Sequence, residues 1–169
     1  MTKEILFIGY DNAQSMDIVG PWEVFAAANM AMRSSCYNLH LVTVDGQAVK
    51  TGSGLNLPAG QIGDVALDDI DTFIVSGGTG ALRASKDERL LGYLQSLSTT
   101  ARRAASVCTG SFLLAAAGLL HNRRATTHWQ SCDLLAGHFP EVEVDPMSIY
   151  VRDGKFWTSA GVTTGIDMS

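Results

Sequence analysis

Basic residues, cysteines and uninterrupted apolar runs are all scarce in this sequence of 169 residues. Twelve Lys and Arg stand against 17 Asp and Glu, which gives a formal net charge of −5. Contacts to nucleic-acid phosphates need a basic face, so this segment is not expected to bind DNA or RNA itself. Cys36, Cys108 and Cys132 are the only cysteines. So odd and sparse a set excludes a disulfide scaffold and favours a reducing, cytoplasmic setting.

Other classes of protein are excluded by features that the sequence lacks. Serine, threonine and glycine interrupt the apolar stretch 104–120, so it is not expected to span a membrane. No basic start followed by an apolar run indicates a signal peptide. His40, His121 and His138 lack the spacing of metal ligands, so no metal site is predicted, and no cofactor is expected.

The chain length and a hydrophobic content of 46% fit one globular domain with a buried core. Short apolar runs alternate with segments of helical periodicity, and glycine turns separate them. This order predicts an α/β domain with a doubly wound parallel sheet between helices. Strands are predicted at 4–9, 37–44, 71–75, 104–107 and 124–127, and helices at 21–32, 87–100, 110–117 and 130–138. The segment 49–57 is predicted to be a short hairpin arm or an edge segment, and 149–159 a hairpin.

The last residues, 161–169, are predicted to form a turn that enters a further helix. One isolated turn of helix is not stable in water. We therefore expect a single domain at 1–169 that is truncated before or within its last helix, in a natural protein that continues.

The segment ASVCTGS at 105–111 leaves an apolar strand and enters a helix of small residues. In such a turn the central residue, Cys108, adopts a strained backbone and points out of the sheet. A cysteine facing the positive end of a helix is expected to have a lowered pKa. Since parallel sheets bind ligands at the carboxyl ends of their strands, Cys108 is predicted to be the functional centre. The alternative is a buried core thiol, the interpretation kept for Cys36 and Cys132.

Further candidates follow neighbouring strands. Gly77 and Gly78 either only form a tight turn or present backbone amides to a ligand oxygen. Asp17, placed in the loop after the first strand, is either a residue at a helix start or an acid and base beside the thiol. His128 is either a partner of the thiolate or a structural histidine.

Together these segments resemble the DJ-1/PfpI (ThiJ, class I glutamine amidotransferase-like) superfamily along essentially the whole chain. The motifs that carry the resemblance are DIVGPWEVF at 17–25, SGGTG at 76–80, SVCTGSFLL at 106–114, RATTHW at 124–129 and WTSAGVTTGID at 157–167. The resemblance implies a flavodoxin-like fold with a cysteine elbow, a ligand site that includes Thr79, and a homodimer.

Two branches of the superfamily are the most similar. Isocyanide hydratases add water to an isocyanide to give an N-formamide, and their nucleophile, proton-transfer and positioning residues match Cys108, Asp17 and Thr109. Histidine-dependent members use a residue that matches His128, but hydratases keep that segment too, so it establishes no catalytic triad. The N-terminal domains of AraC-type regulators are similar at 25–29, 139–146 and 151–160. In such regulators a helix-turn-helix domain follows, and only that domain would bind DNA.

The resemblance and the expected continuation favour a domain that senses a small molecule in an AraC-type regulator. An isocyanide hydratase-like enzyme is the alternative. A redox sensor based on an oxidisable Cys108 is the third reading, which requires a thiol pKa below the ordinary value of about 8.5.

Overall fold

The computed structural model describes residues 2–169, and within them seven strands form one sheet in the order β10-β11-β7-β6-β1-β2-β5. Every neighbouring pair is parallel except the hairpin β10–β11. The strands are β1 (Lys3–Ile8), β2 (Tyr37–Thr43), β5 (Gly60–Gln61), β6 (Ile70–Val75), β7 (Arg103–Val107), β10 (Tyr150–Asp153) and β11 (Phe156–Ser159). The predicted doubly wound sheet is confirmed.

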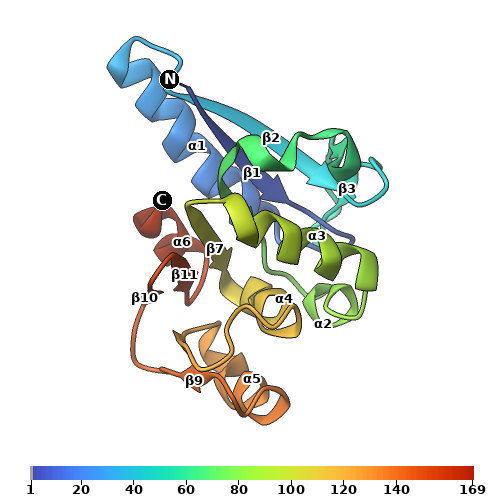
Figure 1. Cartoon of the computed structure of the whole chain (residues 1–169), viewed down its shortest axis with the longest axis vertical. Helices are drawn as coiled ribbons and strands as arrows, with labels where there is room; N and C mark the ends of the chain where they lie inside the picture. Colours follow the sequence, from blue (N-terminus) through green and yellow to red (C-terminus); the bar gives the residue numbers. More distant parts are fainter. Residues whose placement is uncertain (1) are drawn as a thin grey trace.

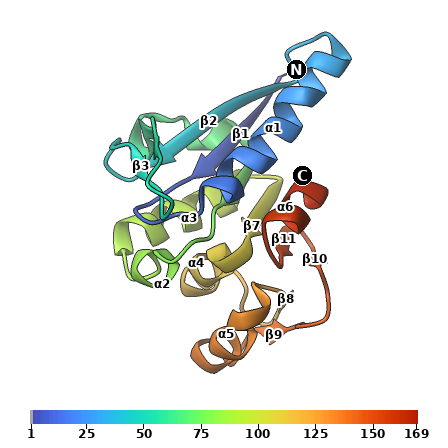
Figure 2. The same ribbon diagram turned by 180° about the vertical axis from the view of Figure 1, so that it is seen from behind.

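Helices cover both faces of this sheet. Figure 1 shows α3 in front of the sheet, and the opposite view in Figure 2 shows α1 and α6 together on the other side. The helices are α1 (Ser15–Met32), α2 (Ala81–Ala84), α3 (Glu88–Thr100), α4 (Ser111–Ala116), α5 (Cys132–His138) and α6 (Val162–Met168). Four 3₁₀ turns, at Ile62–Asp64, Leu67–Asp69, Cys108–Gly110 and Trp129–Ser131, complete the described helical segments.

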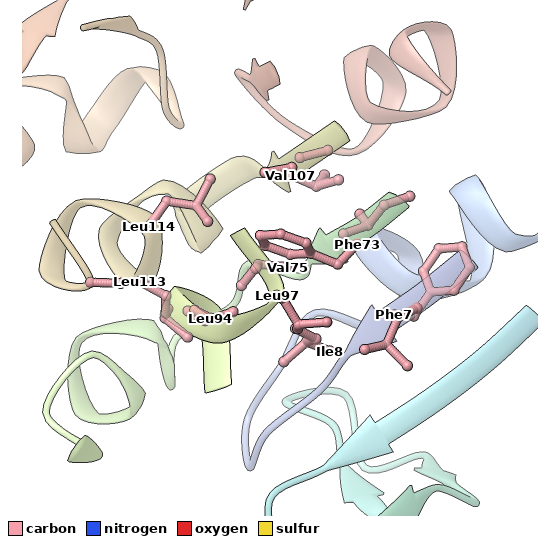
Figure 3. Close-up of a cluster of buried hydrophobic side chains, with 14 of the residues drawn as sticks. Phe7, Ile8, Phe73, Val75, Leu94, Leu97, Val107, Leu113 and Leu114 are labelled. Atoms are coloured by element: carbon pink, nitrogen blue, oxygen red, sulfur yellow. The ribbon is translucent and has the colours of Figure 1, made fainter. Parts of the chain in front are cut away.

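The core lies between the central strands and the helices over them. Phe7 and Phe73, on adjacent strands, are almost fully buried, and Leu94, Leu97 and Leu113 pack there from α3 and α4 (Figure 3). Removing one such aromatic side chain from a core typically costs about 3–5 kcal/mol. This packing fixes the ends of β1, β6 and β7, where the candidate residues lie.

Helix α1 begins at Ser15, six residues before the predicted start. Pro21 was expected to open the helix but lies inside it, so this prediction is wrong. A proline there cannot donate a backbone hydrogen bond to Asp17, four residues earlier. Asp17 itself lies in the first turn of α1 and not in a loop. A carboxylate is favourable there because the backbone N–H groups at a helix start are unpaired.

Two short strand pairs lie outside the main sheet. Of the two alternatives for 49–57, the structure has the hairpin: β3 (Val49–Lys50) pairs antiparallel with β4 (Asn56–Leu57). The strand predicted at 124–127 is shorter, β8 (Arg124–Ala125), and pairs only with β9 (Glu143–Val144). No helix among residues 2–169 is both long and apolar enough to cross a lipid bilayer.

Candidate functional site

Cys108 occupies the sharp turn after β7 that the sequence predicts. Its φ angle is +54°, in the left-handed region that residues with a side chain rarely adopt. The Thr127 hydroxyl donates a 3.0 Å hydrogen bond to the Cys108 carbonyl oxygen. An added Cβ on Gly110 would lie 2.8 Å from the Ser76 carbonyl oxygen, so only glycine fits there. The turn is therefore held in a strained conformation by its neighbours.

Asp17 is completely buried behind this turn. Its Oδ2 accepts a 3.0 Å hydrogen bond from the Gly77 N–H, while its Oδ1 has no partner among the described residues. Burial raises the pKa of Asp17 to about 7, and the Gly77 hydrogen bond opposes this rise. A carboxyl group with such a pKa can both bind and release a proton near neutral pH.

The thiol of Cys108 does not have the lowered pKa expected from the sequence. Burial, followed by the negative charge of Asp17, raises its pKa to about 11, although hydrogen bonds from the Thr109 backbone and side chain oppose the rise. The expectation relied on the helix that follows, but α4 has only six residues and a 3₁₀ turn precedes it. Near neutral pH the group is therefore a neutral thiol.

The glycine turn after β6 packs directly on Cys108 and Thr109. The Gly78 N–H donates to Thr109 Oγ1 at 2.9 Å, and Oγ1 donates to the Gly78 carbonyl at 3.0 Å. Both amides considered for a ligand oxygen, those of Gly77 and Gly78, thus have partners within the protein. Gly78 and Thr79 line the cavity described below, and their role in binding a ligand stays a prediction.

His128 lies at the same end of the molecule as Cys108 but makes no hydrogen bond to it among the described residues. Its Nδ1 accepts a 3.3 Å hydrogen bond from the Gln130 N–H at the start of the next 3₁₀ turn. The ring also lies 5.9 Å from that of Trp129, measured between centroids. The arrangement favours the structural interpretation of His128.

A cavity of about 840 Å³ opens over Cys108 and Thr109. Of the described residues that line it, none is Lys, Arg, Asp or Glu, and only Cys108 and His128 are titratable. Apolar side chains supply much of its wall: Leu82, Phe112, Trp129, Leu134 and Val162. A pocket of this size without formal charges suits an uncharged small molecule.

Several residues of this region were not predicted from the sequence. Residues 160–164 line the cavity at the start of α6, where the sequence indicated a turn that enters a helix but no part in a site. Tyr10 is buried next to Asp17 and Cys108. Burial raises the pKa of the Tyr10 hydroxyl, and the negative charges that Asp17 and Cys108 carry when ionised raise it further. Its place directly after β1 was an available signal, since ligand sites gather at the carboxyl ends of parallel strands.

Comparison with known proteins places these features in a family. The DJ-1/PfpI family model matches residues 3–169. Isonitrile hydratase from Pseudomonas putida is 37% identical over 171 residues, covering 100% of this chain and 70% of that protein. The HTH-type transcriptional regulator GbdR from Pseudomonas aeruginosa is 31% identical over 98% of this chain. This chain spans only 44% of the regulator's length.

The fold is also similar to solved structures. The crystal structure of a ThiJ/PfpI family protein from Pseudomonas syringae superposes with a TM-score of 0.86 and 31% identity. The superposition covers 99% of this chain and 66% of that one.

Proposed function

The chain belongs to the DJ-1/PfpI family, and from this premise we propose that it is a sensing domain of an AraC-type transcription regulator, with its ligand in the cavity beside Cys108. The observation that carries the proposal is the cavity of about 840 Å³ over Cys108 and Thr109, whose described lining contains no Lys, Arg, Asp or Glu. The pKa of Cys108 is raised to about 11, and no histidine donates to it or accepts from it among residues 2–169. A neutral thiol is a weak nucleophile but an adequate contact for a bound molecule.

The lining of the cavity supports an uncharged ligand with an apolar part. A carboxylate or phosphate would find no Lys or Arg among the described lining residues, and an ammonium ion would find no Asp or Glu. Leu82, Phe112 and Leu134 would cover apolar surface, while Thr79 offers a hydroxyl group.

The likeness to a regulator across almost the whole chain supports the same proposal. In such a protein DNA would be bound by a separate helix-turn-helix domain, which is not among these residues. A homodimer and a cytoplasmic location stay predictions.

Ligand protection of Cys108 tests the proposal. Small neutral amides, nitriles and alcohols should slow alkylation of Cys108 in a saturable way, whereas carboxylates and alkylammonium ions of similar size should not. Leu134→Asp, which places a charge in the apolar wall, should abolish the protection. Protection by charged fragments alone would contradict the proposed sensing site.

Isonitrile hydration is the second candidate, and the unpartnered Oδ1 of Asp17 favours it. In this reaction Cys108 Sγ would bond to the isonitrile carbon while the thiol proton passes through Asp17 to the same carbon. Water would then add to the resulting thioimidate, and Sγ would leave with a proton as the N-formamide forms. The likeness to isonitrile hydratase supports this reading.

An alkyl isonitrile such as cyclohexyl isonitrile separates the two candidates. Formation of the N-formamide by the wild-type chain and by Cys132→Ser, but not by Cys108→Ala, would establish hydration and count against a purely sensing role. Saturable binding with no formamide above the Cys108→Ala background would support sensing. The third reading, a redox sensor, loses its basis because the pKa of Cys108 is raised and not lowered.

A further inference from the structure

One peptide group connects Tyr10 to Asp17. The Tyr10 hydroxyl donates a 2.7 Å hydrogen bond to the Ser76 carbonyl oxygen. The Gly77 N–H donates a 3.0 Å hydrogen bond to Asp17 Oδ2. Because the Ser76 carbonyl and the Gly77 N–H belong to the same amide, the two hydrogen bonds form one continuous chain from a phenol to a carboxyl group.

Such a chain strengthens its own members. A donor at an amide oxygen draws electron density from the nitrogen, so the N–H becomes a better donor. The effect is largest away from water, and here the Asp17 side chain is fully buried while Tyr10 is only 9% exposed. The hydroxyl of Tyr10 and the carboxyl group of Asp17 are therefore linked through one buried peptide group.

We propose that Tyr10 is a positioning residue, which orients and polarises the Ser76–Gly77 peptide so that its N–H holds the Asp17 carboxylate. The inference goes beyond the proposed function, because it concerns the protonation of Asp17 whether the site binds or transforms a molecule. Neither ligand nor turnover is needed to test it, so its failure and that of the proposed function can be distinguished.

In its buried surroundings, the protonation of Asp17 depends strongly on the hydrogen bond from the Ser76–Gly77 peptide. Burial favours the protonated carboxyl group, and the Gly77 N–H is the group that favours the carboxylate. The titratable groups that face this pair are Tyr10, from the segment after β1, and Cys108, from the turn after β7. The negative charge of Asp17, after burial, raises the pKa of both, so neither of them supplies a charge that would stabilise the carboxylate. Weakening the Gly77 hydrogen bond should therefore raise the pKa of Asp17 further.

The test is the titration of Asp17 in Tyr10→Phe, followed by the chemical shift of its ¹³Cγ carboxyl carbon. The midpoint, about pH 7 in the wild-type chain, should rise by about half a pH unit. The Gly77 amide proton should also move upfield, since its hydrogen bond becomes weaker. Tyr93→Phe is the matched control, because it removes a hydroxyl that lies beside Gly63 on another part of the molecule.

The direction of the shift distinguishes positioning from a merely structural role. If the hydroxyl of Tyr10 only helped to fill space, its removal would leave the midpoint unchanged. If its removal loosened the region and admitted water, the midpoint would fall toward the ordinary value for aspartate, about 3.9. Either result, or an unchanged Gly77 amide proton, would overturn the proposal.

Discussion

Asp17 and Gly77 lie so close together that a side chain on Gly77 would collide with the Asp17 carboxyl group. The Gly77 N–H donates to Asp17 Oδ2 at 3.0 Å, and a Cβ added to Gly77 would lie 2.6 Å from the same oxygen. That Cβ would also lie 2.7 Å from the Thr109 nitrogen and 2.8 Å from the Cβ of Cys108. A single glycine thus allows the approach of α1, the turn after β6 and the turn after β7.

Gly77→Ala should therefore destabilise the fold by about 1–3 kcal/mol, the usual cost of forcing an extra methyl group into a packed region. Urea unfolding monitored by circular dichroism measures this change. Gly92→Ala is the matched control, because a Cβ at Gly92 within α3 meets no atom within 4 Å apart from its chain neighbours and the backbone of its own helix. In a helix that substitution should stabilise by about 0.5–1 kcal/mol. Equal stability of both variants would show that Asp17 and the two turns can move apart freely.

Protonation of Asp17 should couple stability to pH in an unusual direction. The pKa of its carboxyl group is about 7 in the folded chain and about 3.9 when unfolded. The folded state thus binds a proton more tightly, and the stabilisation is complete below pH 4 and lost as the pH rises to 7. About three pH units correspond to at most about 4 kcal/mol. Urea unfolding at several pH values should show this loss in the wild type but not in Asp17→Asn.

Asp71 provides the opposite control. Burial would raise the pKa of its carboxyl group, but hydrogen bonds from Arg102 and Thr72 outweigh this and lower it. Its contribution should therefore be present above pH 4 and lost as the pH falls further. The stability of wild type relative to Asp71→Asn should fall toward acid pH, whereas its stability relative to Asp17→Asn should fall toward neutral pH.

Alkylation of Cys108 by iodoacetamide should be slow at neutral pH and about tenfold faster for each pH unit up to about pH 10. The reason is that only the thiolate reacts, and burial together with the charge of Asp17 raises the pKa of Cys108 to about 11. A chain with Cys36→Ser and Cys132→Ser isolates this thiol for mass spectrometry. Adding Asp17→Asn should increase the rate at pH 8 severalfold, because a negative neighbour is removed.

Adding His128→Ala to the chain with Cys36→Ser and Cys132→Ser tests whether a histidine activates Cys108. His128 Nδ1 accepts from the Gln130 N–H, so the profile should change by less than about twofold. A rate plateau near pH 7 that disappears in His128→Ala would show that His128 ionises the Cys108 thiol.

The fold was largely predictable because the sequence patterns that indicate its strands, helices and turns are local. The apolar run at β1, the stripe of leucines in α3 and the motif around Cys108 each depend on neighbours in the sequence. The early start of α1 was missed because Pro21 indicates a helix start, whereas Asp17 already occupies the first turn. A proline within a helix is tolerated only when tertiary packing compensates, and sequence propensity does not contain that information.

The proximity of the candidate site residues was predictable, but their protonation was not. Cys108 and Asp17 each follow a parallel strand, which was enough to bring them to one edge of the sheet. The pKa of Cys108 depends on how deeply the turn is buried and on the distance to Asp17, and neither quantity can be obtained from residue order. The link from Tyr10, which follows β1, to Asp17, in the first turn of α1, runs through a backbone amide that follows β6, so no pattern of side chains indicates it.

The paired hydrogen bonds between Thr109 and Gly78 should determine the rigidity of the cavity floor. Oγ1 of Thr109 accepts from the Gly78 N–H and donates to the Gly78 carbonyl, so one hydroxyl satisfies both backbone groups. Thr109→Val keeps the shape of the side chain but removes both bonds, which should cost about 1–3 kcal/mol because polar groups lose their partners. Gly78 has a φ angle of +136°, which only glycine adopts readily, so the loop cannot easily find another conformation.

Thr109→Ser separates the hydroxyl from the methyl group. It should keep both hydrogen bonds to Gly78 and lose less than half of the stability that Thr109→Val loses, measured by urea unfolding. Amide hydrogen exchange gives the local measurement: the Gly78 N–H should exchange at least about tenfold faster in Thr109→Val than in Thr109→Ser, because each 1.4 kcal/mol of lost protection corresponds to a factor of ten. Equal exchange in the two variants would mean that the Thr109 hydroxyl does not hold the glycine turn, and the cavity floor would then depend on the close packing of Gly77 alone.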